Sequence, residues 1–130
     1  MSDTDLRDFY RRYVAAANTR DFDRMDEFIG DEPAYYGEVR TREATVESLK
    51  AIIDAVPDFH WEVTDLLIMG NRLAARLINT GTPVKEWLGV TPTGRSFEIT
   101  EYAVYEIQDG RFAYMSNVHD VEELERQLAA

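Results

Sequence analysis

The chain of 130 residues contains no cysteine and only two histidines. Without cysteine, a disulfide framework and thiolate chemistry are excluded. The histidines, His60 and His119, are far apart, and the sequence has no His-x-His or His-x-x-x-His pair. Histidines at such short spacings are typical of zinc sites. We therefore expect no metal site in this protein.

Long apolar runs are also missing, and none approaches the roughly 20 residues needed to cross a membrane. The charged N-terminus lacks the apolar stretch of a secretory signal, so we expect a cytoplasmic protein. The net charge is −11, which makes nucleic acids and anionic membranes poor partners. A glycine-rich phosphate loop and a Gly-x-Ser-x-Gly elbow are absent as well. Nucleotide binding and serine-nucleophile chemistry are therefore unsupported.

The first half of the sequence is mainly helical in pattern. Apolar residues recur at three- and four-residue spacings over 3–18, which predicts an amphipathic helix. A second helix is expected over 21–29, ended by Gly30. Residues 34–39 are short, aromatic and strand-like. A third helix is expected over 41–55, with Thr41 as its cap and Ala44, Leu49, Ile52 and Ile53 on its buried side.

From Phe59 onward the hydrophobic period changes to two, as in half-buried strands. Turn signals at Gly70-Asn71 and Asp109-Gly110 predict hairpins. The expected elements are strands beginning at Phe59 and spanning 73–80, 97–107 and 112–118, followed by a helix over 121–128. Helices segregated from strands predict the α+β class with an antiparallel sheet. Because a sheet of this size twists, we expect one domain over 1–130 whose cone-shaped, strongly bent sheet wraps around the helices and leaves an apolar pocket.

Asp120 is the first candidate for a catalytic group. It stands at the end of the last predicted strand and precedes an apolar helix. A carboxylate facing an apolar pocket is desolvated, which makes it a usable general acid or base near neutrality. The alternative is structural, because aspartate is a favoured N-cap residue.

Glu101 and Arg76 are the other candidates. Glu101 shares a strand face with apolar residues at 97, 99, 103 and 105, and a carboxylate in that set is unusual if the face is buried. It then forms a pair of carboxylates with Asp120. Arg76 also lies among apolar neighbours, so it either extends to solvent or pairs with Asp120.

Alternation along the last strand assigns the remaining residues to faces. Ser116, Val118 and Asp120 share one face, and Asn117 and His119 share the other. We therefore expect His119 to point away from Asp120, toward the outside, and His60 to point outward as well. The residues predicted to line the pocket are Tyr13, Tyr35, Trp61, Phe97, Ile99, Tyr105, Ser116 and Val118.

The second half of the sequence resembles the SnoaL-like polyketide (ester) cyclases of the nuclear-transport-factor-2-like superfamily. The matching positions are Leu88-Gly89, Pro92-Thr93-Gly94-Arg95, Tyr105, Asp109-Gly110, Asp120 and Gln127-Leu128. Two positions depart from the family pattern. Ser116 replaces a tryptophan, and Ala103 occupies an acidic or polar position. The resemblance implies a conical α+β fold, no metal or cofactor, and Asp120 as general acid and base in an aldol ring closure.

Taken together, these features predict an acid–base enzyme acting on a hydrophobic carbonyl compound. One alternative is epoxide hydrolysis with Asp120, Arg76 and Glu101. Another is a ketosteroid-isomerase type of reaction, with Tyr13, Tyr35 or Tyr105 donating to an oxyanion. A third is a binding or dimerisation module without catalysis.

The outer face of the predicted sheet also suggests a partner. Thr100, Tyr102 and Val104 lie near its middle and form an apolar patch on a monomer. We therefore expect a homodimer through this face.

Overall fold

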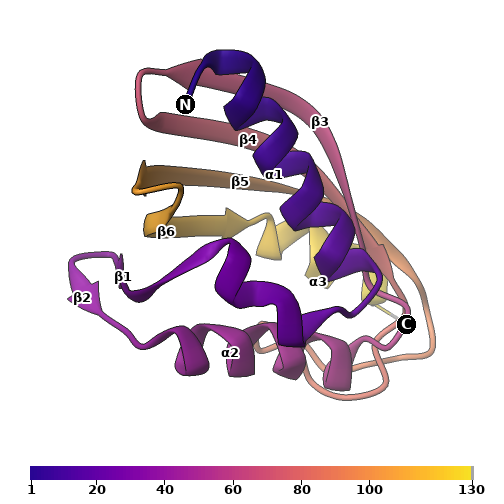
Figure 1. Cartoon of the computed structure of the whole chain (residues 1–130). Helices are drawn as coiled ribbons and strands as arrows, with labels where there is room; N and C mark the ends of the chain where they lie inside the picture. Colours follow the sequence, from indigo (N-terminus) through magenta and orange to yellow (C-terminus); the bar gives the residue numbers. More distant parts are fainter. Residues whose placement is uncertain (130) are drawn as a thin grey trace.

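The computed structural model describes residues 1–129 (Figure 1). Its elements, in chain order, are α1 (Asp3–Asn18), the 3-10 helix η1 (Phe22–Glu27), β1 (Ile29–Tyr35), β2 (Glu38–Val39), α2 (Arg42–Ala55), β3 (His60–Met69), β4 (Arg72–Gly81), β5 (Phe97–Gln108), β6 (Arg111–His119) and α3 (Val121–Leu128). Within residues 1–129, no helix is both long enough and apolar enough to cross a membrane.

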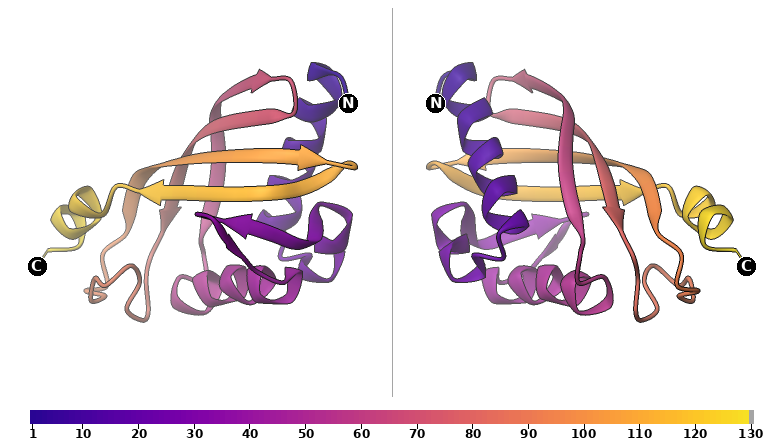
Figure 2. Two further views of the ribbon diagram at one scale, coloured as in Figure 1. Left: turned by 90° about the vertical axis from the view of Figure 1, so that its left-hand side faces the viewer. Right: turned by 90° about the vertical axis from the view of Figure 1, so that its right-hand side faces the viewer.

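The strands form a curved sheet in the order β2-β1-β6-β5-β4-β3. Strands β3 to β6 pair antiparallel with their neighbours, whereas β1 pairs with β6 in parallel. The sheet curls around α1, and α2 lies across its open side (Figures 1 and 2). The predicted α+β class with a bent sheet around the N-terminal helices is therefore confirmed. The one difference in strand direction is the β1–β6 pair.

The segment between α1 and α2 differs from the prediction. Its helical part is the short 3-10 helix η1, and the chain is already extended at Ile29. The backbone N–H of Phe112 donates to the carbonyl of Phe28 at 2.7 Å and ties this segment to β6. Gly30 lies within β1, where a Cβ atom would stand 3.1 Å from the Phe112 carbonyl oxygen. Pairing with β6 thus outweighs the local helical pattern.

A tight turn at Tyr36 and Gly37 joins β1 to β2. Both residues have positive φ angles, 50° and 82°, the combination found in type I′ turns. The exposed Tyr36 side chain reaches β6, where its hydroxyl donates to the backbone carbonyl of Asn117 at 2.5 Å. The hairpin is thereby held against the C-terminal half of β6.

The core lies between α1 and the concave face of the sheet. In β5, every second residue from Phe97 to Ile107 is buried, as a strand with one inward face requires. Phe112 packs edge to face against Phe9 and Tyr13, at centroid distances of 5.0 and 4.9 Å. Side chains fill the space around Phe112, whereas a cavity remains between α2 and the sheet.

Strand β3 is an edge strand, and polar side chains from α1 and the turn after it cover its free edge. The Asn18 amide donates to the Trp61 carbonyl and accepts from the Trp61 N–H, both at 2.9 Å. Arg7 and Arg20 donate to further backbone carbonyl groups on or beside this edge. Unpaired backbone groups on an edge invite association with other strands. These side chains therefore both fix α1 on the sheet and protect its edge.

Replacing Asn18 tests this attachment. Asn18→Ala removes both hydrogen bonds and leaves the part-buried N–H of Trp61 without its partner. We expect the free energy of unfolding, measured by urea denaturation, to fall by about 1–3 kcal/mol. Thr19→Ala is the matched control, because the Thr19 hydroxyl bonds only to residues of its own helix and to Asp21. Equal losses in the two variants would contradict the role given to Asn18.

Candidate active site

An apolar cavity lies between the sheet, α1 and α2. Its volume is about 500 Å³, within the range of small-molecule sites. Most of the wall is aliphatic or aromatic, with Tyr10, Tyr13, Val14 and Ala17 from α1, Leu49 and Ile52 from α2, and Trp61, Leu77, Trp87, Tyr105 and Met115 from the sheet and its loops. Such a wall favours an apolar ligand.

Helix α2 forms one side of the cavity. It begins after Thr41, as predicted, and the Thr41 hydroxyl accepts from the Ala44 N–H at 3.1 Å. Leu49 and Ile52 lie on its inner side but are only half-buried, because they border the cavity. Ala44 was expected on the buried side and is exposed instead.

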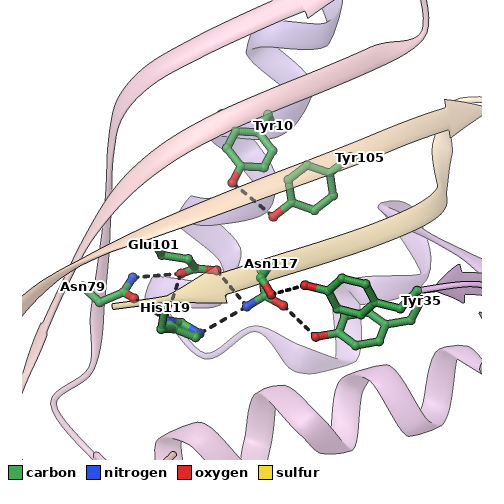
Figure 3. Close-up of polar contacts among 8 residues, drawn as sticks. Tyr10, Tyr35, Asn79, Glu101, Tyr105, Asn117 and His119 are labelled. Carbon is green, nitrogen blue, oxygen red and sulfur yellow. Dashed lines mark hydrogen bonds and ion pairs between the residues drawn. The ribbon is translucent and has the colours of Figure 1, made fainter. Parts of the chain in front are cut away.

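Glu101 of β5 is the centre of a polar network in the cavity wall (Figure 3). Only 7% of its side chain is exposed. Oε1 accepts from Asn79 Nδ2 at 2.9 Å, and Oε2 accepts from Asn117 Nδ2 at 3.1 Å. His119 closes the ring, with Nδ1 2.8 Å from Asn79 Oδ1 and Nε2 3.1 Å from Asn117 Nδ2. Strands β4, β5 and β6 thus each contribute to one closed ring of hydrogen bonds.

The partners of His119 fix its protonation state. Asn79 Oδ1 only accepts, so the proton is on Nδ1, and Asn117 Nδ2 only donates, so Nε2 carries none. His119 is therefore neutral. Burial lowers the pKa of His119 and outweighs the opposite effect of the Glu101 charge, which agrees with this assignment. Within residues 1–129, no lysine or arginine pairs with Glu101, and amide groups hold its carboxylate.

Tyrosine hydroxyl groups lie in the same wall. Those of Tyr10 and Tyr105 are 3.2 Å apart and share a hydrogen bond (Figure 3). Burial raises the pKa of Tyr10, Tyr13 and Tyr105, and the Glu101 charge adds to the effect, so these phenols stay protonated. Within residues 1–129, every fully buried side-chain polar atom has a partner, yet the Tyr13 hydroxyl makes no hydrogen bond. Since Tyr13 is 6% exposed and lines the cavity, this hydroxyl is a free donor for a bound molecule.

Asp120 lies outside the cavity, and its predicted position is wrong. Its side chain is exposed and caps α3 by accepting from the Glu123 N–H at 3.2 Å, which is the structural alternative. A β-bulge accounts for the error. Next to the hairpin turn Ile107 pairs with Phe112, whereas the next residue of β5 away from the turn, Glu106, pairs with Tyr114. From there to the end of β6 the register is shifted by one residue. Such a shift moves every following side chain to the opposite face.

The same shift brings Asn117 and His119 into the wall, although His119 was expected to face outward. Glu101 pairs with His119 across the strands, so the two side chains share a face. Without the bulge, the register of the turn would place Val118 opposite Glu101. The hairpin signal was visible in the sequence, but the bulge was not.

Arg76 also lies outside the cavity, contrary to its assignment as a catalytic residue. It is half exposed on the outer face of β4 and forms an ion pair with Asp65 of β3. The inward positions of β4 alternate with it and include Asn79. Asp120, Arg76 and Glu101 therefore do not converge, and the arrangement needed for the epoxide-hydrolase alternative is absent from residues 1–129.

The residues predicted to line the pocket differ in their positions. Ser116 and Val118 border the cavity, but their strand positions belong to the outer face, and Val118 is 57% exposed. Phe97 and Ile99 are buried in the core and do not border it. Trp87 stacks on Phe97 at 5.1 Å and forms the wall in its place. The other predicted residues lie in the wall, namely Tyr13, Tyr35, Trp61 and Tyr105.

Comparison with known proteins identifies a family and several solved structures that resemble this chain. A family model described as SnoaL-like polyketide cyclase matches residues 7–128. A SnoaL-like polyketide cyclase from Agrobacterium tumefaciens is 27% identical, with a TM-score of 0.90 over 95% of this chain and 98% of that one. TsrD from Streptomyces laurentii is 25% identical, with a TM-score of 0.88 over 100% and 98% of the two chains. IdmH from Streptomyces antibioticus is 26% identical, with a TM-score of 0.83 over 95% and 97%. None of the curated proteins compared with the chain matches it.

The state of His119 gives a pH dependence of stability. Because its pKa is lowered in the folded protein, the unfolded chain binds more protons below about pH 6.5, and stability falls as the pH falls. The slope for one proton is at most about 1.4 kcal/mol per pH unit. In His119→Gln, we expect the free energy of unfolding from urea denaturation to lose this part of its dependence on pH between about pH 5 and 7. His60→Gln, at an exposed position, is the control and keeps the wild-type slope. A wild-type slope in His119→Gln would contradict the assignment.

Proposed function

This chain belongs to the SnoaL-like polyketide cyclase family, and from that premise we propose that it closes a ring in a hydrophobic carbonyl compound by acid–base catalysis. The observation that carries the proposal is the buried carboxylate of Glu101 in the wall of an apolar cavity. In this proposal Glu101 takes the role that was expected of Asp120.

Glu101 is suited to the role of base because, within residues 1–129, its carboxylate has no cationic partner. Both oxygens accept from the amides of Asn79 and Asn117, which orient the group without transferring a proton to it. The neutral imidazole of His119 holds both amides in place. Lone pairs of the carboxylate remain available on the cavity side, where a substrate proton is taken.

The reaction has two steps, and the proton that is removed in the first step is returned in the second. Glu101 first removes a proton from a carbon next to a carbonyl group, and the electrons of the C–H bond move into the enolate. The Tyr13 hydroxyl donates a hydrogen bond to the enolate oxygen. The enolate carbon then attacks a second carbonyl of the same molecule and forms the new C–C bond. The resulting alkoxide takes the proton back from Glu101, which restores the carboxylate.

The apolar wall supports this chemistry in two ways. It excludes water, which strengthens hydrogen bonds to the developing negative charge. It also holds a flexible substrate folded, so that the two reacting carbons lie close together. The aromatic side chains Trp61, Trp87 and Tyr105 provide surfaces on which a planar substrate packs.

Proton abstraction is testable without the natural substrate. The probe is 2-tetralone, whose protons next to the carbonyl exchange with deuterium from the solvent, as NMR detects. We expect the wild-type protein to accelerate this exchange. Glu101→Gln should lose about 10²–10⁴-fold of the protein-dependent rate, because an amide is not a base.

Two further variants sharpen this experiment. Glu98→Gln changes an exposed carboxylate on the same strand and should keep the wild-type rate. Asp120→Asn should keep it as well, because Asp120 caps α3 outside the cavity. Loss of exchange in Asp120→Asn but not in Glu101→Gln would refute the assignment of the base. Absence of exchange with the wild-type protein would favour a binding module.

We also propose that the protein is a homodimer through the outer face of the sheet. Tyr102, Val104 and Val118 are exposed there, together with Leu67 of β3. The ion pair between Arg76 and Asp65 lies in the same surface. Within the described residues 1–129, no helix covers this face (Figure 2). A second copy related by a two-fold axis brings apolar and oppositely charged groups together.

A charge within this face tests the dimer. Val104→Glu should convert the dimer to a monomer in sedimentation velocity at micromolar protein concentration, because the new carboxylate would be buried against its symmetry mate. Val39→Glu, on the exposed strand β2, is the control and should remain dimeric. A monomeric wild-type protein would rule out the interface.

A further inference from the structure

Arg40 is the one cationic side chain in the cavity wall of the described chain, since His119 is neutral. Most arginines of this acidic protein bond to carboxylates or backbone carbonyls. Within residues 1–129, Arg40 forms no ion pair, although the sequence contains 25 aspartates and glutamates. An arginine that lines an apolar cavity without an anionic partner is suited to binding an anionic group of a ligand.

The position of Arg40 is fixed by its neighbours. Its backbone N–H donates to the Pro33 carbonyl at 2.9 Å, at the base of the β1–β2 hairpin. Its guanidinium carbon lies 4.6 Å from the centre of the Tyr35 ring, a cation–π contact. The Tyr35 hydroxyl in turn donates to Asn117 Oδ1 at 2.8 Å. The guanidinium is therefore held over a ring but keeps its N–H groups free of carboxylates.

The wall beside Arg40 changes in polarity along α2. Arg40 immediately precedes the N-cap Thr41, so it lies at the N-terminal end of the helix. The cavity-facing residues of α2 are Thr45 and Ser48 near this end, and Leu49 and Ile52 farther along. The positive end of the helix dipole adds to the preference for an anion there. One end of the cavity is thus polar and cationic, and the rest is apolar.

Glu101 lies on the other side of Asn117 from Tyr35 (Figure 3). A negatively charged ligand group is repelled by Glu101 and attracted by Arg40. We propose that Arg40 binds a carboxylate on an otherwise apolar ligand and so orients the carbonyl part of that ligand toward Glu101. The orientation rests on the proposed function, whereas the binding of the carboxylate does not.

Two probes of equal shape test the binding, namely 2-naphthoate and the neutral 2-naphthamide. In isothermal titration calorimetry, we expect the wild-type protein to bind 2-naphthoate roughly tenfold or more tightly than 2-naphthamide. Arg40→Gln should abolish this preference and change the affinity for 2-naphthamide by less than about twofold. Arg40→Lys should retain part of it, because lysine keeps the charge but lacks the planar fork. Added salt should weaken the preference, since Arg40 is partly exposed.

Arg111→Gln is the matched control, because Arg111 is exposed at the start of β6 and outside the cavity, and it should keep the wild-type preference. Glu101→Gln should keep or strengthen the preference, because it removes the repulsion between Glu101 and the anionic probe, and this separates the inference from the proposed function. If Glu101→Gln leaves deuterium exchange intact while Arg40→Gln removes the preference, only the proposed base fails. Equal affinity of the wild-type protein for the two probes, binding of neither, or a preference that persists in Arg40→Gln would overturn the inference.

Discussion

A closed ring of hydrogen bonds joins Glu101, Asn79, His119 and Asn117 in the cavity wall. A buried carboxylate is costly unless its oxygens are bonded, and here the amides of Asn79 and Asn117 satisfy both. These amides are themselves oriented by His119, which accepts from one and donates to the other. Removal of any member leaves a partner in the low-dielectric wall without its hydrogen bond. The ring therefore fixes three strands in register and a carboxylate in one orientation.

The hydrophobic pattern of the sequence was sufficient to predict the elements in which that pattern extends over many residues. The amphipathic residues of α1 and the alternation in β5 gave the right elements, because each of these segments packs one face against the core. The 3-10 helix η1 was predicted as a longer helix over 21–29, and β1 was predicted only in its last residues, as part of a strand over 34–39. Their conformation depends on pairing with β6, which is distant in the sequence, since Ile29 pairs with Phe112. Local propensity does not contain that information.

The site was harder to predict than the fold for a related reason. Alternation tells which residues of a strand share a face, but not which face is inward. At Glu101 the apolar neighbours left this question open, and the residue lies in the wall. The bulge near the start of β6 reverses which side chains at the end of that strand face inward. His119, and not Asp120, therefore lies at the cavity. The resemblance to the cyclases pointed to the family but not to this local change in register.

Two charged groups, Glu101 and Arg40, lie at different places in the described cavity wall. Glu101 is held by neutral donors and remains an acceptor, whereas Arg40 stands over Tyr35 at the polar end of α2. Tyr35 and Asn117 connect them. In the proposed function, Glu101 as base and Arg40 as cation select both the kind of ligand and its orientation in the apolar cavity. Specificity would then arise from where the few polar groups interrupt the apolar wall.

The protonation state of His119 is the sharpest test of the ring of hydrogen bonds around Glu101. Nitrogen-15 NMR of the imidazole rings at neutral pH distinguishes the two neutral tautomers and the imidazolium, with His60→Gln used to assign the signals. We predict a neutral His119 with its proton on Nδ1, as the Asn79–His119–Asn117 contacts require. A proton on Nε2, whether in the other neutral tautomer or in the imidazolium, would contradict the ring of hydrogen bonds that holds Glu101.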